Sequence, residues 1–310
     1  MENQIEIMNL LQKKKAFELE LQSLAYGAIE IREKDSKKYI YVHYREDGIS
    51  LTKYVGEYSD EVYNLILNNS IKAKQIKKQL REISKKLKEL NYVEADLSEK
   101  VEKTIDFARK NMVDTIYKQA ILEGVATTYA DTENIIEGGQ VNNMTSEDIL
   151  KIINLKHAWE FILNKNVILS ETNFNLLCEI NRMVEEGFYY SAGKLRDVPV
   201  NIGGTSWQPN IPIESEIKND LENILNKNIS NIDKSIELLL YTMKRQIFID
   251  GNKRTAVIFS NHYLISKGEG IIVIPSDLVE NFKNLLIPYY EGKDEIKIKT
   301  FLKEKCFMKL

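Results

Sequence analysis

The chain has 310 residues, a length that predicts two structural units, because domains usually run to about 100–200 residues. Its 43% hydrophobic and 29% charged residues, with a mean hydropathy of -0.33, are typical of a soluble globular protein and exclude a membrane-spanning helix. The net charge of -3 argues against general affinity for nucleic acid. The opening residues have no apolar core of a secretion signal, so we expect a cytoplasmic protein.

Cysteine and histidine are too scarce to build a metal centre. The two cysteines, Cys178 and Cys306, are far apart in the sequence, which excludes a disulfide framework and a thiolate metal site. The three histidines stand singly, at His43, His157 and His262. We therefore expect no zinc site.

Residues 1–112 are predicted to form a first unit of a helix, a three-stranded meander and a long helix. Apolar residues recur at helical spacing over 1–25. Residues 28–56 then contain three β-branched and aromatic runs separated by Lys-Asp-Ser and Asp-Gly turn signals. Helical spacing returns over 58–91. Since a short meander cannot bury its apolar face alone, we expect the flanking helices to cover it.

The second of these helices is strongly basic. Eight lysine and arginine residues and two glutamates lie between 71 and 91. The pattern is typical of a solvated helix face, and this is the reading we favour. A contact between residues 72–88 and nucleic acid or an acidic partner stays open.

Residues 113–310 are predicted to form a second, mainly helical unit. The helical segments, which start just before this unit, are 98–130, 145–165, 170–186, 213–228, 232–248, 253–267 and 276–290. Residues 187–212 interrupt them, because they are rich in glycine, proline and β-branched residues. This interruption favours a short β-hairpin or an extended flap, whose edge could pair with an incoming peptide.

The segment most informative about function is QIFIDGNKRTAV, residues 246–257. Asp250-Gly251-Asn252 favours a turn with positive φ, and Lys253 and Arg254 open the next helix. A helix N-terminus with two adjacent cations can bind an anion, and a neighbouring carboxylate suits Mg²⁺ bound to phosphates. A capped turn between two helices explains the pattern equally well from spacing alone.

Residues 246–257 resemble the signature of the Fic family, H-x-F-x-[D/E]-G-N-[G/K]-R-x-x-R. The matching residues are Phe248, Asp250, Gly251, Asn252, Lys253 and Arg254. Further upstream, YADTENIIEGGQVNN resembles the family's regulatory helix, and AGKLRDVPVNIGG resembles its target-binding flap. The resemblance covers about residues 113–290, and it implies an all-helical Fido fold with a short β-hairpin flap.

The resemblance also implies a function and roles for individual residues. Such proteins transfer AMP, or a related group, from a nucleoside triphosphate such as ATP to a Ser, Thr or Tyr hydroxyl of a target protein, which can be the chain itself. Gln246 stands at the catalytic position of the motif. The implied roles are metal ligand for Asp250, phosphate binding for Gly251, Asn252, Lys253 and Arg254, a loop anchor for Phe248, regulation for Glu137 and Gly138, and target binding for Arg196, Val198, Val200 and Ile202.

Three departures from the family pattern put the activity in doubt. Gln246 stands where the family has its catalytic histidine, and an amide cannot accept the hydroxyl proton. No other histidine replaces it, because we expect His262 to project away from the loop. Val257 stands at the second arginine of the signature, and Glu133 stands at the serine or threonine of the regulatory motif. In the family the regulatory glutamate pairs with that arginine, so Glu137 lacks this partner here.

Several readings therefore stay open. The chain is an attenuated protein adenylyltransferase, a nucleotide-binding protein without catalysis, or an interaction protein that acts through residues 1–112. Lys253 replaces the commoner glycine, as in Doc-like relatives that transfer phosphate, so the transferred group is open too. A homo-oligomer, and an engineered origin of Gln246, also stay open.

Overall fold

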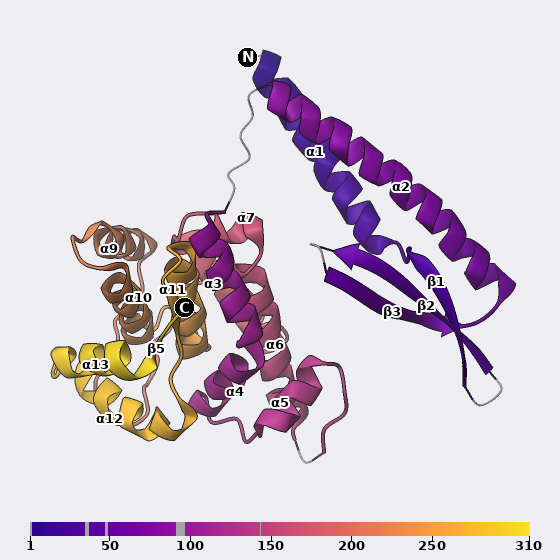
Figure 1. The fold of residues 1–310 in the computed structure, drawn as a ribbon. Coiled ribbons are helices and arrows are strands. Elements are labelled where there is room, and N and C mark those ends of the chain that lie inside the picture. Colours follow the sequence, from indigo (N-terminus) through magenta and orange to yellow (C-terminus); the bar gives the residue numbers. More distant parts are fainter. Residues whose placement is uncertain (1, 35–36, 47–48, 91–96, 143) are drawn as a thin grey trace. The chain divides into compact units, whose positions relative to one another are not determined.

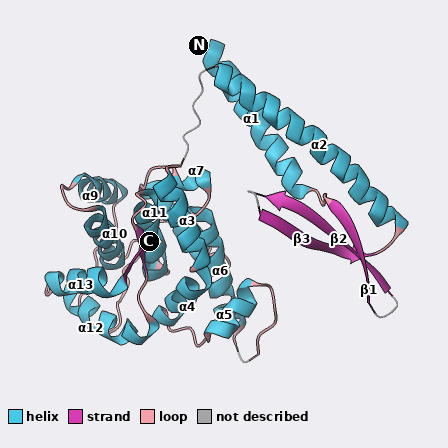
Figure 2. Ribbon diagram, in the orientation of Figure 1, coloured by secondary structure: helices cyan, strands magenta, loops and turns pink. Residues whose placement is uncertain are grey.

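The chain folds into two compact units, Met1–Asp96 and Leu97–Leu310, in a computed structural model (Figure 1). Residues described are 2–34, 37–46, 49–90, 97–142 and 144–310. Helices dominate, and both sheets are small (Figure 2), which confirms the predicted mainly helical fold. Among the described residues, every helix is too short or too polar to cross a bilayer.

The first unit has the predicted order of helix, meander and long helix. Its elements are α1 (Glu2–Ser23), β1 (Ala28–Lys34), β2 (Lys37–Glu46), β3 (Ile49–Glu57) and α2 (Asp60–Glu89). The strands form one antiparallel sheet in the order β1-β2-β3. The two predicted turns between the strands, at 35–36 and 47–48, lie outside the described residues. Ser59 caps α2 by accepting a hydrogen bond from the backbone N–H of Val62.

Two separate apolar clusters hold the first unit together. Ile66 of α2 packs on Ile40 and Val42 of the sheet, and further along α2, Ile83 and Leu87 pack on Leu10 of α1. The long helix therefore covers the meander with one half and pairs with α1 through the other, as the short sheet requires.

The boundary between the units differs from the predicted one at residue 112. Helix α3 (Glu99–Lys110) belongs to the second unit, because Val101, Ile105 and Ala108 are buried in its main core. The predicted helix 98–130 is also wrong, since α3 ends at Lys110 with Asn111 as its C-cap, and α4 follows as Met112–Leu122. The Asn111 side chain donates to the Phe107 carbonyl, which competes with the helical hydrogen bonds at this point.

The remaining elements of the second unit follow the predicted segments in most places. They are α5 (Tyr129–Ile136), α6 (Ser146–Ile162), α7 (Lys165–Ile168), α8 (Phe174–Val184), α9 (Glu214–Asn226), α10 (Asn231–Arg245), α11 (Asn252–Ser266), β4 (Gly270–Ile272), η1 (Ser276–Leu278), α12 (Val279–Tyr290), α13 (Glu295–Phe301), η2 (Leu302–Cys306) and β5 (Phe307–Lys309). Between α8 and α9 the described residues contain no strand, so the flap is an extended loop with turns and not a β-hairpin.

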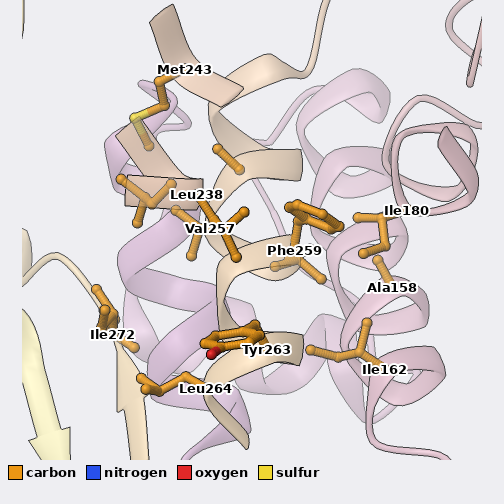
Figure 3. Packing of buried hydrophobic residues seen from close by; sticks show 14 of the residues in the cluster. Ala158, Ile162, Ile180, Leu238, Met243, Val257, Phe259, Tyr263, Leu264 and Ile272 are labelled. Atoms are coloured by element: carbon orange, nitrogen blue, oxygen red, sulfur yellow. The ribbon is translucent and has the colours of Figure 1, made fainter. Parts of the chain in front are cut away.

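Helix α11 is the centre of the second unit. Its residues from Arg254 to Ile265 are buried on every side, and Figure 3 shows Val257, Phe259 and Leu264 among side chains from neighbouring helices. The antiparallel pair of β4 and β5, which the sequence did not reveal, is tied to this helix. The Asn261 amide donates to the Ile272 carbonyl and accepts from its N–H, both at 2.8 Å. The N-terminus of α11 is thus fixed by a rigid core.

Candidate active site

The loop between α10 and α11 has the turn that the sequence predicted. Gly251 has a φ of +72° and directly precedes the first residue of α11. Gln246, which ends α10, has a φ of +46°, a conformation that is uncommon for residues other than glycine. Two left-handed residues therefore bound a short loop, and strain of this kind is concentrated at functional sites.

Asn252 fixes the shape of this loop from inside. Its Oδ1 accepts a hydrogen bond from the Phe248 N–H at 3.0 Å, and its Nδ2 donates to the Phe248 carbonyl at 2.8 Å. Phe248 is 1% exposed, so it lies in the core as the resemblance implied. The Asn252 side chain is used within the loop, so its phosphate-binding role would rest on its backbone N–H, one of the unpaired donors at a helix start.

Arg254 lies in the first turn of α11 and is the best buried cation of the site. Its side chain is 3% exposed. Nη2 lies 2.9 Å from Glu185 Oε1 and 3.6 Å from Asp250 Oδ2, and Nε lies 3.8 Å from Glu123 Oε2. Within the described part of the chain, its Nε and Nη1 have no hydrogen-bond partner. A buried guanidinium with free donors is the group expected to bind a phosphate or a carboxylate.

Glu185, like Glu123, belongs to this site although it was not predicted from the sequence. It follows α8 directly, and its side chain is 2% exposed. A Cβ added to Gly251 would lie 2.2 Å from Glu185 Oε1, so any larger residue there would displace this carboxylate, and the φ of +72° also favours glycine. Burial raises the pKa of Glu185 to about 7, and Arg254 acts in the opposite direction. Its spacing of four residues from Asn181, also buried, is the one signal that could have placed it on the inner face of α8.

Asp250 and Lys253 lie at the open side of the site. The Asp250 side chain is 51% exposed, and its Oδ1 accepts from the Gly251 N–H at 2.6 Å. Lys253 Nζ lies 3.3 Å from Glu123 Oε2. Among the described residues no group of three or more metal-ligating side chains is formed. Mg²⁺ bound through one carboxylate and substrate phosphates needs no such group, and an exposed carboxylate such as Asp250 fits it.

Gln246 is held in place by hydrogen bonds at both ends of its amide. Nε2 donates to the Met243 carbonyl at 2.6 Å, and Oε1 accepts from Asn252 Nδ2 at 3.2 Å. No atom of this amide can act as a base near neutral pH. The loop is therefore assembled around a residue that can orient a hydroxyl group but cannot take its proton.

Arg196 ties the flap to the loop. Its guanidinium is buried and donates to the carbonyls of Gln246, Val198, Pro209 and Asn210. Burial lowers the pKa of this guanidinium. The guanidinium therefore uses its donors on carbonyls of the protein itself. Its implied role in target binding could only be indirect, through the flap that it holds in place.

The three other predicted flap residues are more accessible than Arg196. Val198 is 46% exposed, and Val200 and Ile202 are half-buried. The flap is also fixed at its start, because the Gly193 N–H donates to Asn181 Oδ1 while Asn181 Nδ2 donates to the Asp250 carbonyl. Helix α8 thus joins the flap and the loop, and the target-binding role of the three side chains stays a prediction.

The predicted regulatory residues are exposed in this structure. Glu137 is the C-cap of α5, and Gly138 follows it with a φ of +82°. Val257 is 1% exposed and packs in the main core. An arginine at this position would place a charge in that core, so Val257→Arg is not expected to restore a simple ion pair with Glu137. A regulatory role for Glu137 and Gly138 stays a prediction.

His262 is buried away from the loop, which confirms that it cannot replace a catalytic histidine. Its Nε2 donates to the Val167 carbonyl at 2.8 Å, and its Nδ1 lies 2.9 Å from Thr172 Oγ1. Burial lowers the pKa of His262 to about 4 from an ordinary 6.5, and the bond to Val167 acts the other way. His262 is therefore neutral in the folded protein at the pH values where the unfolded chain takes up a proton.

We expect this histidine to make the protein sensitive to acid. Since the unfolded state binds the proton more readily, the contribution of His262 is complete above pH 6.5 and is lost as the pH falls towards 4. The free energy of unfolding should drop by about 3 kcal/mol over this interval. Urea unfolding at pH 7 and pH 4.5 measures the change, and His262→Gln should reduce it. An equally steep decline in the variant would contradict the assignment.

Comparisons with known proteins agree with this arrangement. Residues 171–264 match the model of the Fic/DOC family. A fragment of Fic-1 from C. elegans superposes with a TM-score of 0.54 at 19% identity, over 79% of this chain and 73% of that one. A Fic domain containing signaling protein from Bacteroides thetaiotaomicron gives 0.52 at 21% identity, over 62% and 76%.

A Fic family protein from Desulfovibrio desulfuricans gives a TM-score of 0.51 at 15% identity, over 66% of this chain and 69% of that one. At such identities the structures establish the fold alone. None of the curated proteins matches the sequence. The matched residues include α8, the flap and the α10–α11 loop. Residues 171–264 of this chain are therefore similar in sequence to the Fic/DOC family, and the superpositions show that the chain shares the fold of Fic-domain proteins.

Proposed function

We propose that the α10–α11 loop binds the phosphates of a nucleoside triphosphate such as ATP, together with Mg²⁺, and that transfer to a protein hydroxyl is attenuated because Gln246 supplies no base. The observation that carries the proposal is the buried Arg254 guanidinium, whose Nε and Nη1 lack hydrogen-bond partners in the described part of the chain. It lies at the positive end of α11, whose first N–H groups are unpaired donors. Free buried donors are costly unless a ligand accepts their hydrogen bonds.

Five residues at the end of the loop and the start of α11 have parts in this function. Arg254 and Lys253 neutralise phosphate charge, and the Gly251 conformation turns the first N–H groups of α11 towards the ligand. Asp250 would hold Mg²⁺, because half of its side chain is exposed. When bound, the metal neutralises charge on the phosphates. The Asn252 amide keeps the loop in shape before the ligand arrives, which avoids the cost of ordering it on binding.

The importance of Gln246 follows from the chemistry of the transfer step. A target hydroxyl forms a new bond to the α-phosphate, the bond to the β-phosphate breaks, and pyrophosphate leaves. The hydroxyl proton needs an acceptor, which is typically worth about 10²–10⁴-fold in rate. The Gln246 amide lacks a basic nitrogen, so we propose binding with slow transfer. Transfer of a phosphate group from the same site is the alternative chemistry. Incorporation of label from the nucleotide part of ATP, compared with label from its terminal phosphate, distinguishes AMP transfer from phosphate transfer.

Asp250→Asn tests the metal ligand without changing the shape of the loop. We expect it to weaken nucleotide binding in Mg²⁺ by about tenfold or more, because an amide is a poor ligand for this ion. Isothermal calorimetry with and without Mg²⁺ gives the measurement, and Asp277→Asn, an exposed site outside the loop, is the control. Nucleotide binding by the unmodified protein that needs no metal and is indifferent to Asp250→Asn would count against the proposal.

A further inference from the structure

Glu185 lies against the same surface of the loop that the phosphates would use. Its Oε1 lies 2.9 Å from Arg254 Nη2 and would be 2.2 Å from a Cβ at Gly251. The carboxylate therefore contacts both the cation of the site and the glycine that lets a ligand approach the helix N-terminus. An anion bound there meets a negative group that the protein itself supplies.

Around Arg254 the negatively charged side chains outnumber the positively charged ones. Arg254 and Lys253 face three carboxylates, those of Glu123, Glu185 and Asp250, and the four nitrogen–oxygen distances between them lie between 2.9 and 3.8 Å. Glu185 is the most buried of the three, at 2% exposure, compared with 12% for Glu123 and 51% for Asp250. Solvent therefore shields its charge least.

The Glu185 carboxylate depends on its ion pair with Arg254. Both of its oxygens lack a hydrogen-bond partner in the part of the chain that the structure describes, although Oε1 forms the ion pair with Arg254. A buried carboxylate without hydrogen bonds gains little from its position beyond that one pair. A ligand that offers Arg254 a better acceptor can thus compete with Glu185 for this guanidinium.

Resting on the proposed function, we infer that Glu185 determines the charge of the ligand that the loop accepts. It competes with phosphate for Arg254, so the bare nucleotide polyanion is rejected and the nucleotide is taken as its less negative magnesium complex. Glu185 is in this sense a specificity-determining residue. Asp250 draws in the metal, and Glu185 excludes the ligand that comes without it.

Glu185→Gln removes this charge with almost no change in shape. Without Mg²⁺ we expect the variant to bind ATP about tenfold more tightly or better than the unmodified protein, since one opposing unit charge at this range is worth more than 1.4 kcal/mol in a partly shielded site. With Mg²⁺ the difference in ATP affinity between the variant and the unmodified protein should be smaller. Isothermal calorimetry in EDTA and in MgCl₂ measures both, at pH 8, which lies above the pKa of about 7 of Glu185.

Two further variants make the test specific. Glu179→Gln makes the same substitution on the exposed face of α8, where Glu179 pairs with Arg182, and it should bind as the unmodified protein does. Glu185→Ala removes the carboxylate as well, and it replaces Glu185→Gln if circular dichroism shows that variant to be unfolded. We expect Glu185→Ala also to bind metal-free ATP more tightly.

The outcomes separate this inference from the proposed function. Binding of MgATP by the unmodified protein, with no gain for either Glu185 variant in EDTA, overturns the inference and leaves the proposed function standing. A gain of the same size for Glu179→Gln also overturns it, because the effect would then be one of overall charge. Absence of ATP binding by every folded variant in both buffers overturns the inference and the proposed function together.

Discussion

Gln246→His is expected to raise nucleotide transfer to protein by about 100-fold or more. Histidine supplies a nitrogen that accepts a proton near neutral pH, and the amide that it replaces does not. The loop keeps the two hydrogen bonds between Asn252 and Phe248, although it loses the one from Asn252 Nδ2 to Gln246 Oε1. Incorporation of label from radioactive ATP, into the protein itself or into lysate proteins, measures the change.

Gln246→Ala is the matched variant for this experiment. It should leave nucleotide binding almost unchanged and remove any transfer that depends on amide orientation. Robust transfer by the unmodified protein that Gln246→Ala abolishes would identify an enzyme with an unconventional residue. Transfer seen only with Gln246→His would identify a nucleotide-binding protein with an intact scaffold. Absence of transfer in all three, at saturating MgATP, would contradict the transferase assignment.

Arg254→Gln is expected to abolish measurable nucleotide binding and to destabilise the protein. Loss of the guanidinium removes the charged phosphate donor, and it also leaves Glu185 buried without its ion-pair partner. Breaking a buried pair in this way costs about 3–5 kcal/mol. Calorimetry measures the binding, and urea unfolding at pH 8 measures the free energy of unfolding.

The double variant Arg254→Gln/Glu185→Gln separates these two effects. Removing both charges should recover most of the lost stability, because no unpaired charge remains in the interior. It should not recover nucleotide binding. Equal loss of stability in the single and the double variant would show that the ion pair in the structure contributes nothing.

The loop itself could be predicted from the sequence because its chemistry is local. Asp250, Gly251 and Asn252 are adjacent in the chain, and their preferences for a turn and a helix start act within a few residues. The burial of Phe248 follows from the same short segment. The three strands of the first unit could be predicted equally well, since each has its own run of β-branched and aromatic residues.

Glu185 could not be predicted in the same way, because its place depends on packing between distant segments. Helix α8 joins the loop through Asn181, whose amide donates to the Asp250 carbonyl and to Thr255 Oγ1. This contact and the packing of α8 on α11 bring Glu185 onto Gly251. The strands β4 and β5 were missed for a related reason, since three residues each show no periodicity and their pairing joins segments far apart in the chain.

The most direct test of phosphate binding by the α10–α11 loop is to locate the bound nucleotide on the protein. Two-dimensional NMR of the backbone amides follows Gly251, Asn252, Lys253 and Arg254 while MgATP is added. The expected result is that these four resonances shift and saturate together, and that adenosine with Mg²⁺ leaves them in place, because the loop binds the phosphates. Saturable binding of MgATP that shifts other amides and leaves these four unchanged would contradict it.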